Sequence, residues 1–251
     1  MNIRKQQISA EIDETGSATV ISLSSRYNVS LETIRRDLKD LEKKGKLIRV
    51  HGGAISYQAD DAGTSFINRS KANVNKKRTL VEKIVCEMFE GAMIGLDAST
   101  SSWLFAQELP NIPCTVVTNS MNAVATLAKK DNIKVICLGG EYSAKYEGFY
   151  GSLTKTALAK LNLDFSVISC SGFDFDKGIW DSNEINLDIK RMLLEVADHA
   201  IVIADETKYK KKSLLKICDT KDIDYLVTNI SLESETKQYL EEKYNIVLIN
   251  Q

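Results

Sequence analysis

The strongest constraint on the fold is an alternation of short apolar runs with helical stretches, which begins near Asn75 and continues to the C-terminus. Short apolar strands that alternate with helices indicate a mainly parallel, open sheet covered by helices on both faces. The expected strands are Ala92–Leu96, Thr115–Val117, Lys134–Leu138, Phe165–Ser169, Ala200–Ala204, Tyr225–Val227 and Asn245–Ile249, and the expected helices include Lys76–Phe89, Ser102–Leu109, Ala123–Lys129 and Glu184–Ala197.

Charge and composition divide the chain and exclude several protein classes. The 251 residues carry a formal net charge of -1, with 43% hydrophobic and 27% charged residues, which excludes a disordered chain, a collagen-like chain and a disulfide-rich miniprotein. Residues 1–57 hold 10 basic and 7 acidic residues, whereas the remainder holds 23 basic and 27 acidic residues. The basic excess therefore lies at the N-terminus, where it is compatible with a nucleic-acid partner.

Cysteine and histidine usage favours a cytoplasmic protein without a metal site. The five cysteines form no CxxC pair and are interpreted as small buried hydrophobes in a reducing compartment. His51 and His199 are too far apart in the sequence to suggest a zinc site. The N-terminus lacks the apolar region of a signal peptide, and no apolar run approaches the length of a membrane span, so no membrane partner is expected.

Two domains and a connecting segment are expected. Residues 58–74 are mostly small and polar and show no periodicity, which is typical of a linker. The expected organisation is a DNA-binding domain over residues 1–57, a linker over 58–74 and an α/β domain over 75–251.

The N-terminal segment predicts three helices. Ile3–Ile12 forms the first, a turn follows at Thr15–Ala18, and Thr19 caps the second helix, Val20–Arg26. Asn28 tolerates the left-handed conformation that ends a helix, and Ser30 is a good N-cap for the third. The third helix, residues 31–43, has an apolar stripe expected to face inward (Leu31, Ile34, Leu38 and Leu41) and a polar face (Glu32, Thr33, Arg35, Arg36 and Lys39).

Two helices joined by a short turn, followed by a small wing, favour DNA binding. The second helix of such a pair enters the major groove, where an arginine binds guanine with two bonds or holds a phosphate. Gly45 ends the helix, and strands Lys46–Val50 and Ala54–Tyr57 form a wing around the turn His51–Gly53. Alone, the Arg pair is more often a solvated helix face, and His51 is a surface turn residue as readily as a backbone contact. The candidate DNA-binding residues are Ser30, Glu32, Thr33, Arg35, Arg36, Lys39, Arg49 and His51.

The stretch Val29–Leu38, together with Gly45 and Arg49–Ala54, closely resembles the signature of DeoR-type bacterial transcription regulators. The resemblance covers about 40 residues. It implies a winged helix-turn-helix domain, mainly α with a β wing. It also implies a sugar-metabolism operon as the target and a C-terminal sensor for a phosphorylated sugar.

Polar residues follow several predicted strands of the C-terminal domain, and ligands of open α/β sheets bind at the carboxyl ends of the strands. Hydroxyl groups at a helix N-terminus form a good phosphate cradle, and glycines permit close backbone approach. Each pattern alone is more often a cap or a turn, and neither GxGxxG nor GxxxxGK[ST] is present. The strand ends in question are Asp97–Ser102, Thr118–Ser120, Gly139–Glu141, Cys170–Gly172 and Asp205–Lys208.

The same residues look like the DeoR-type effector domain, which is similar in fold to ribose-5-phosphate isomerases and CoA transferases. Ser99 and Ser101 depart from the commoner Asp-Ala-Gly-Thr-Thr loop, and Gly178–Asn186 with Trp103 resembles the branch of L-fucose operon regulators. The resemblance therefore favours L-fuculose 1-phosphate as effector and implies no cofactor. The candidate effector-binding residues are Asp97, Ser99, Thr100, Ser101, Thr118, Asn119, Ser120, Gly139, Gly140, Gly172, Asp181, Asn183, Glu184, Lys190 and Lys208.

Roles within this set are hypotheses. Ser99, Thr100 and Ser101 hold the phosphate, and Lys190 or Lys208 adds positive charge. The sugar hydroxyls are expected to bind Asp97, Asn119, Asp181, Asn183 and Glu184. Either Trp180 or Trp103 covers a deoxysugar methyl group or packs in the core.

Two other functions are weighed against a regulator. A sugar-phosphate isomerase needs a base such as Glu184 or Asp174, but an isomerase has no use for a DNA-binding half. An architectural DNA binder without a ligand conflicts with the clustered polar strand ends. A regulator acting on symmetric double-stranded operator DNA is expected to be a homo-oligomer, a dimer or a tetramer.

Overall fold

A computed structural model describes residues 3–15, 17–50, 52–56, 65–211 and 213–250. The chain divides into two compact units, Met1–Ser65 and Phe66–Gln251. Each unit has its own buried core, so each is described separately.

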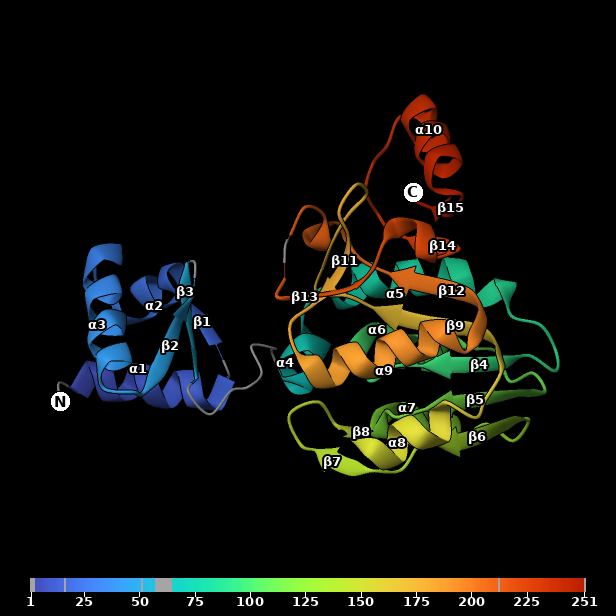
Figure 1. Ribbon diagram of the computed structural model, residues 1–251, viewed down its shortest axis with the longest axis horizontal. Coiled ribbons are helices and arrows are strands. Elements are labelled where there is room, and N and C mark those ends of the chain that lie inside the picture. Colours follow the sequence, from blue (N-terminus) through green and yellow to red (C-terminus); the bar gives the residue numbers. More distant parts are fainter. Residues whose placement is uncertain (1–2, 16, 51, 57–64, 212, 251) are drawn as a thin grey trace. The chain divides into compact units, whose positions relative to one another are not determined.

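The described residues of the N-terminal unit form three helices and a small antiparallel sheet (Figure 1). The helices are α1 (Ile3–Thr15), α2 (Val20–Tyr27) and α3 (Leu31–Lys43), and the strands β1 (Ser17–Thr19), β2 (Leu47–Val50) and β3 (Gly53–Ser56) lie in the order β1-β3-β2. One apolar side of each helix faces a common core, which contains Ile8, Ile12, Leu23, Ile34, Leu38, Leu41 and Leu47.

Local sequence signals place these helix ends as expected. Thr19 and Ser22 form a capping box at the start of α2, and Asn28 ends that helix with a φ of 49°. Ser30 caps α3 by accepting a hydrogen bond from the backbone N–H of Thr33 at 3.2 Å. The predicted helix-turn-helix is therefore confirmed.

Two expectations for this unit are wrong. Part of the predicted turn Thr15–Ala18 belongs to strand β1, which pairs with β3, so the wing sheet has three strands rather than two. Close approach of β1 requires a glycine at 53, because a Cβ there would lie 2.3 Å from the Ala18 carbonyl oxygen. Leu31 does not join the inward stripe, since 41% of its surface is exposed.

The second unit is built on a parallel sheet of seven described strands, in the order β15-β14-β12-β9-β4-β5-β6. All seven correspond to the apolar runs predicted from the sequence, so the predicted parallel α/β fold is confirmed. The strands are β4 (Met93–Leu96), β5 (Cys114–Thr118), β6 (Ile133–Cys137), β9 (Leu163–Ser169), β12 (Ala197–Ile203), β14 (Tyr225–Val227) and β15 (Val247–Ile249).

Helices cover both faces of this sheet. Neighbouring residues of a strand point to opposite faces, so one strand contributes apolar side chains to both cores. In β9, for example, Val167 packs in one core and Ile168 in the other. The first core contains residues of α5 (Val74–Ile84), α6 (Thr100–Glu108) and α7 (Met121–Leu127). The second contains residues of α8 (Ser152–Leu158), α9 (Glu184–Glu195) and α10 (Ser234–Tyr244).

Smaller elements surround the sheet and were not expected from the sequence. A hairpin joins β7 (Glu141–Ser143) to β8 (Gly148–Tyr150), and β10 (Gly172–Asp174), β11 (Gly178–Asp181) and β13 (Leu215–Cys218) form a separate antiparallel sheet. Three short 3-10 turns complete the described elements: η1 (Val85–Glu87), η2 (Glu206–Lys208) and η3 (Thr220–Asp222).

The second half of the expected linker is ordered in the C-terminal unit. Helix α4 (Phe66–Lys71) begins this unit, and Phe66 is buried with its ring 5.7 Å from that of Trp103. Residues 57–64 lie outside the described part of the chain. The structure thus differs from the expected linker over residues 66–74.

All five cysteines are free, but they are not uniformly buried as expected. Cys114 and Cys170 are buried, whereas Cys86 and Cys137 are exposed. Within the described ranges, no cluster of three or more His, Cys, Asp or Glu side chains is arranged to hold a metal ion. No described helix combines the length and the apolar character that crossing a membrane requires.

Candidate functional site

The exposed face of α3 and the first wing strand form one hollow. Its volume is about 290 Å³, and five of the predicted DNA-binding residues line it: Glu32, Arg35, Arg36, Lys39 and Arg49. The 3.6-residue period of α3 places the first four on one face, and β2 brings Arg49 beside them. The structure therefore brings these predicted residues together.

The arginines of this hollow differ in their partners. Arg35 lies 3.5 Å from the Glu32 carboxylate, and Arg49 lies 3.7 Å from that of Glu42. Arg36 is exposed and makes no ion pair within the described part of the chain. Its guanidinium is therefore available for an external acceptor.

The remaining predicted residues of this set have other positions. Ser30 and Thr33 hydrogen-bond to each other through their hydroxyl groups, at 2.9 Å, as part of the helix cap. His51 lies outside the described residues.

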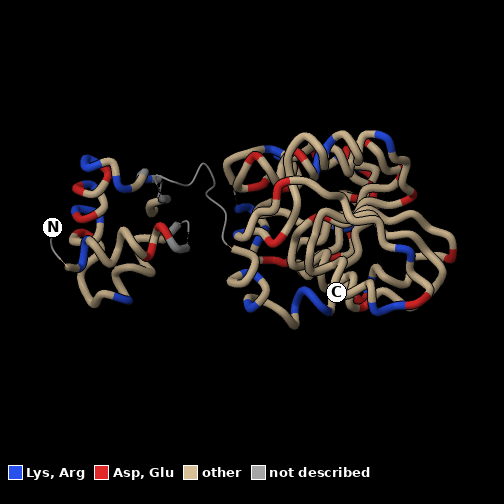
Figure 2. Tube along the Cα trace, turned by 90° about the horizontal axis from the view of Figure 1, so that it is seen from below, with Lys and Arg blue, Asp and Glu red and all other residues tan. Residues whose placement is uncertain are grey.

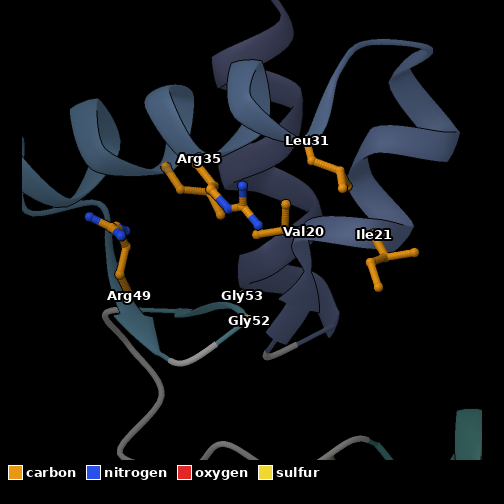
Figure 3. Close-up of a pocket in the computed structure, with 8 residues that line it drawn as sticks. Val20, Ile21, Leu31, Arg35, Arg49, Gly52 and Gly53 are labelled. Atoms are coloured by element: carbon orange, nitrogen blue, oxygen red, sulfur yellow. The ribbon is translucent and has the colours of Figure 1, made fainter.

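A second hollow, of about 390 Å³, adjoins the first and is partly apolar (Figure 3). Ile21 at the start of α2 is 70% exposed, and Leu31 at the start of α3 borders the same hollow with Arg35. An arginine beside exposed aliphatic groups can contact both a guanine edge and a thymine methyl group. Sequence reasoning missed this hollow because it placed Leu31 in the core.

Charges of both signs are interspersed along the chain in both units (Figure 2). A uniformly basic surface therefore does not distinguish the N-terminal unit. The hollow on α3 and β2 gathers four basic side chains and one acidic side chain.

The C-terminal unit contains a small polar pocket at the carboxyl ends of β4, β9 and β12, which are adjacent in the sheet. The pocket has a volume of about 90 Å³. Residues from α4, α5 and the start of α6 complete its wall. It is lined by Arg69, Ala72, Asn73, Lys77, Ser99, Thr100, Ser101, Ser169, Cys170, Ser171, Lys190, Asp205 and Lys208.

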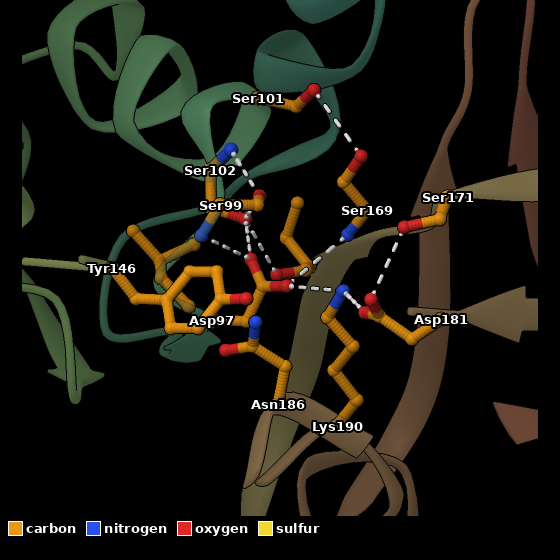
Figure 4. Close-up of polar contacts among 12 residues, drawn as sticks. Asp97, Ser99, Ser101, Ser102, Tyr146, Ser169, Ser171, Asp181, Asn186 and Lys190 are labelled. Atoms are coloured by element: carbon orange, nitrogen blue, oxygen red, sulfur yellow. Dashed lines mark hydrogen bonds and ion pairs between the residues drawn. The ribbon is translucent and has the colours of Figure 1, made fainter. Parts of the chain in front are cut away.

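Asp97 shapes the loop that enters this pocket (Figure 4). Its carboxylate accepts hydrogen bonds from the backbone N–H of Ser99 at 3.1 Å and from the Ser102 hydroxyl. Ser99 then caps α6 by accepting from the Ser102 N–H at 3.1 Å. The N–H groups of Thr100 and Ser101 lie in the first turn of α6, where the helix itself offers no acceptor. This turn thus presents free donors and the positive end of the helix dipole to the pocket.

A buried ion triplet lies behind the loop (Figure 4). The Lys190 ammonium is ion-paired with Asp181 and lies 3.4 Å from a carboxylate oxygen of Asp97. Burial opposes the charged forms of Lys190 and Asp181, yet the two carboxylates raise the pKa of Lys190 and that lysine lowers the pKa of Asp181. Asp97 and Asp181, which were predicted to bind sugar hydroxyls, thus pair with Lys190 within the chain.

Lys77 enters the pocket from α5 and was not predicted from the sequence. Its ammonium donates to the carbonyl oxygen of Arg69 at 2.9 Å and to the Thr100 hydroxyl at 3.0 Å, and only 7% of the residue is exposed. Burial lowers the pKa of Lys77 to about 8, and the charges of Lys208 and Arg69 act in the same direction. A bound anion would favour the charged form of this lysine.

Cys170 is the cysteine among the described residues that line the pocket, and its thiol is not activated. Burial raises the pKa of Cys170 to about 12, so its thiol is protonated near neutral pH. The carboxylates considered as isomerase bases lie elsewhere: Glu184 is exposed, and Asp174 accepts backbone hydrogen bonds from Asp176 and Lys177 in a tight turn.

Five of the predicted effector-binding residues line the pocket: Ser99, Thr100, Ser101, Lys190 and Lys208. The strand order explains why the predicted residues at the ends of β5 and β6 do not line the pocket. Thr118 ends β5 and is followed by Asn119 and Ser120, whereas Gly139 and Gly140 follow β6. Strands β5 and β6 are one and two strands beyond β4.

The polar residues at the end of β5 form hydrogen bonds within the chain. The Thr118 hydroxyl donates to the Leu96 carbonyl oxygen at 2.8 Å, and Ser120 caps α7. The Asn119 amide donates to the Phe149 carbonyl oxygen at 3.0 Å, while its own side-chain oxygen is buried without a partner in the described structure.

The predicted glycines approach protein backbone rather than a ligand. A Cβ at 140 would lie 2.4 Å from the Tyr150 carbonyl oxygen, and one at 172 would lie 1.8 Å from that of Lys211. Gly139 accepts a hydrogen bond from the Thr154 hydroxyl at 2.8 Å through its carbonyl oxygen.

Asn183 caps α9 and donates to the Tyr146 hydroxyl at 3.1 Å. Trp103 donates to the Thr126 hydroxyl at 3.0 Å and packs on Phe66. Neither Asn183, Trp103 nor Trp180 lines the pocket described above.

The main residues that sequence reasoning missed are Arg69, Asn73, Lys77, Ser169 and Ser171. Ser169 ends the predicted strand Phe165–Ser169, and Ser171 lies within the strand end Cys170–Gly172 that was considered from the sequence, but neither was chosen as a candidate. The others come from the expected linker and the first helix after it, where no motif marks a ligand.

Comparisons with known proteins agree with this architecture. Residues 4–59 match the family described as "DeoR-like helix-turn-helix domain", and residues 72–230 match "DeoR C terminal sensor domain". The protein named L-fucose operon activator of Haemophilus influenzae is 44% identical over 96% of this chain and 97% of its own length. The protein of the same name from Escherichia coli is 34% identical over 85% of this chain and 88% of its own.

Among solved structures, ribose 5-phosphate isomerase A from Methanocaldococcus jannaschii is similar with a TM-score of 0.41 and 16% identity, over 56% of each chain. The helix-turn-helix match and the names of the two close relatives identify a transcription regulator rather than an enzyme. The chain belongs to the DeoR family of transcriptional regulators and is a homologue of L-fucose operon regulators.

Proposed function

We propose that this regulator controls an operon for sugar catabolism, and specifically for L-fucose, in response to a phosphorylated sugar. The observation that carries the proposal is the meeting of four cationic side chains with the first turn of α6 in one pocket. These side chains are Arg69, Lys77, Lys190 and Lys208. Among charged lining residues, only Asp205 opposes them within the described part of the chain. The pocket is therefore suited to an anion.

The phosphate is proposed to bind the free N–H groups of Thr100 and Ser101, with the hydroxyls of Ser99, Thr100 and Ser101 around it. Lys208 adds positive charge from η2. L-fuculose 1-phosphate is the effector we favour, because relatives that align over most of the chain are named for the L-fucose operon.

Operator DNA is proposed to bind the hollow on α3 and β2. Arg36 and Arg35 lie near the start of α3, where side chains of a recognition helix reach base edges. Lys39 and Arg49, which line the hollow, are proposed to contact phosphates, and His51 is proposed as a contact of the wing turn. Ser30, Glu32 and Thr33 complete the proposed surface at the helix N-terminus.

We propose a homodimer or homotetramer that acts in the cytoplasm, since symmetric operators match symmetric oligomers. Both relatives compared above are named activators, which favours activation here. The effector changes DNA affinity only to the extent that it binds the two states of the regulator differently.

The test is a fluorescence-anisotropy titration of the full-length protein onto its own upstream promoter DNA. It is run without ligand, with L-fuculose 1-phosphate and with ribose 5-phosphate. A shift with the fucose compound alone supports the effector and the target. Tight promoter binding unmoved by either compound would reject the effector, and absence of promoter binding would reject the operator.

A further inference from the structure

Arg69 carries buried donors that have no acceptor. The residue lies in α4, and its Nε and Nη2 atoms are buried without a hydrogen-bond partner in the described structure. Its guanidinium carbon lies 5.3 Å from the centre of the Tyr146 ring, so the ring supports the charge but accepts no conventional hydrogen bond from these atoms. Buried donors of a charged group are normally paired, so this arrangement calls for an explanation.

The carboxylates in this region are already occupied. Asp97 and Asp181 both neutralise Lys190, and no ion pair joins either to Arg69 within the described ranges. Asp205 accepts hydrogen bonds from the N–H and the hydroxyl of Thr207. An acceptor from outside the chain fits the guanidinium better than any of these groups.

Arg69 lines the same pocket as the first turn of α6. Lys77 ties the two together, because its ammonium binds both the Arg69 carbonyl oxygen and the Thr100 hydroxyl. A guanidinium offers two parallel N–H donors, a geometry that matches the oxygens of a phosphate monoester. The donors without partners are thus placed beside the proposed phosphate cradle.

Helix α4 also has a special place in the chain. It is the first element of the C-terminal unit, and nine residues lie between Phe66 and Ser56, the last residue of the wing strand β3. The helix is short and is held by the buried Phe66 ring and by a hydrogen bond from its N–H to the Lys145 carbonyl oxygen at 2.8 Å. A shift of α4 therefore occurs close in sequence to the DNA-binding unit.

We propose that Arg69 is a phosphate ligand, and that its contact with the bound effector fixes α4 and so transmits effector binding to the DNA-binding unit. This inference rests on the proposed function for its second half, whereas anion binding by Arg69 stands independently of the sugar. The other phosphate contacts come from α6 and η2, which belong to the body of the sensor unit. Among the proposed phosphate contacts, only Arg69 lies on α4. Its contact with the effector therefore stabilises one position of that helix relative to another.

The experiment compares four full-length proteins: wild type, Arg69→Gln, Arg69→Lys and Lys71→Gln. Lys71 is a matched control, because it lies on the same helix but is exposed and does not line the pocket. Inorganic phosphate binding is measured first by calorimetry, so that the result does not depend on the identity of the sugar. We expect Arg69→Gln to weaken phosphate binding by about tenfold or more, since two charge-assisted hydrogen bonds are lost. Arg69→Lys keeps the positive charge but loses the paired N–H donors, so its phosphate affinity should lie between those of wild type and Arg69→Gln. The phosphate affinity of Lys71→Gln should match that of wild type.

The second arm measures promoter affinity by anisotropy, without ligand and at saturating L-fuculose 1-phosphate. In Arg69→Gln we expect unchanged promoter affinity without ligand and a ligand-induced change reduced toward none. Lys208→Gln is the complementary variant, since it weakens ligand binding but keeps the full change at saturation.

Phosphate affinity of Arg69→Gln within twofold of wild type, or no phosphate binding by wild type, would overturn the ligand role. A full promoter response of saturated Arg69→Gln would overturn the coupling role. A wild type that binds phosphate but does not bind its promoter, or binds it without responding to L-fuculose 1-phosphate, contradicts the proposed function and leaves the calorimetric result intact. Circular dichroism and thermal unfolding of each variant establish that α4 substitutions leave the protein folded.

Discussion

The two cationic regions of this molecule hold their charges in opposite ways. On α3, the Arg35 side chain is 56% exposed and lies on one helix with Arg36 and Lys39. In the sensor pocket, Lys77 and Lys190 are only 7% and 5% exposed and come from different helices. The first region is solvated and contiguous in sequence, whereas the second is desolvated and assembled by the strand order. Solvated charges are screened by salt much more than buried ones, so the comparison has measurable consequences.

The largest expected difference between the two regions is in salt dependence: added salt should weaken promoter binding far more than phosphosugar binding. A dimer carries two copies of Lys39 and Arg49, the proposed phosphate contacts, which gives about four phosphate contacts. For that number of contacts, promoter affinity should fall by about 10²-fold between 50 and 200 mM salt. Phosphosugar affinity in the same buffers should change by less than about tenfold, because its cations are buried. Anisotropy and calorimetry give the two slopes, and equal slopes would contradict the contrast.

Replacing Lys190 should have the largest effect on stability. Lys190→Met leaves the buried carboxylates of Asp97 and Asp181 without their cation, which should cost about 3–5 kcal/mol of unfolding free energy. Urea unfolding followed by tryptophan fluorescence reports on this unit, because Trp103 and Trp180 both lie in it.

The matched control is Lys155→Met, which removes a partly exposed ion pair to Asp188 at 2.8 Å. It should cost about 0–1 kcal/mol. A loss below about 1 kcal/mol for Lys190→Met would show that the triplet is not a buried support of the pocket.

Substitutions on α3 should change DNA binding without changing stability. Arg36→Ala should weaken promoter binding by about 1–3 kcal/mol if the arginine contacts a base. Arg35→Ala should cost less, because Glu32 already neutralises part of its charge. Lys44→Ala, at the other end of α3 and outside the hollow, is the control for general charge loss. Equal weakening on scrambled DNA would assign Arg36 to phosphate instead of a base.

The same contrast explains what sequence reasoning found and missed. The helix ends at Thr19, Asn28 and Ser30 depend on local chemistry, so they were predictable from neighbouring residues. All seven strands of the parallel sheet were likewise marked by local apolar runs. Their spatial order was not, because it depends on packing between segments far apart in the sequence.

That order decides which polar strand ends share the pocket. The ends of β4, β9 and β12 meet, whereas those of β5 and β6 lie beyond them. Arg69 was missed because it lies in a segment that was expected to be a linker. Lys77 was missed because a lysine in an amphipathic helix is normally solvated, and only the tertiary structure buries it.

Lys77 offers the finest test of the comparison, because its pKa is lowered to about 8. An anion binds more tightly when Lys77 is protonated, so binding raises the pKa of Lys77 and takes up a proton above pH 8. Phosphosugar affinity should therefore be nearly constant from pH 7 to 7.5. It should then fall toward one decade per pH unit above pH 8, which is about 1.4 kcal/mol per unit. Calorimetry in two buffers of different ionisation enthalpy at pH 8.5 measures the proton uptake directly. Lys77→Met should bind more weakly at pH 7 and lose the alkaline slope, and a slope that persists in this variant would assign the titration to another group.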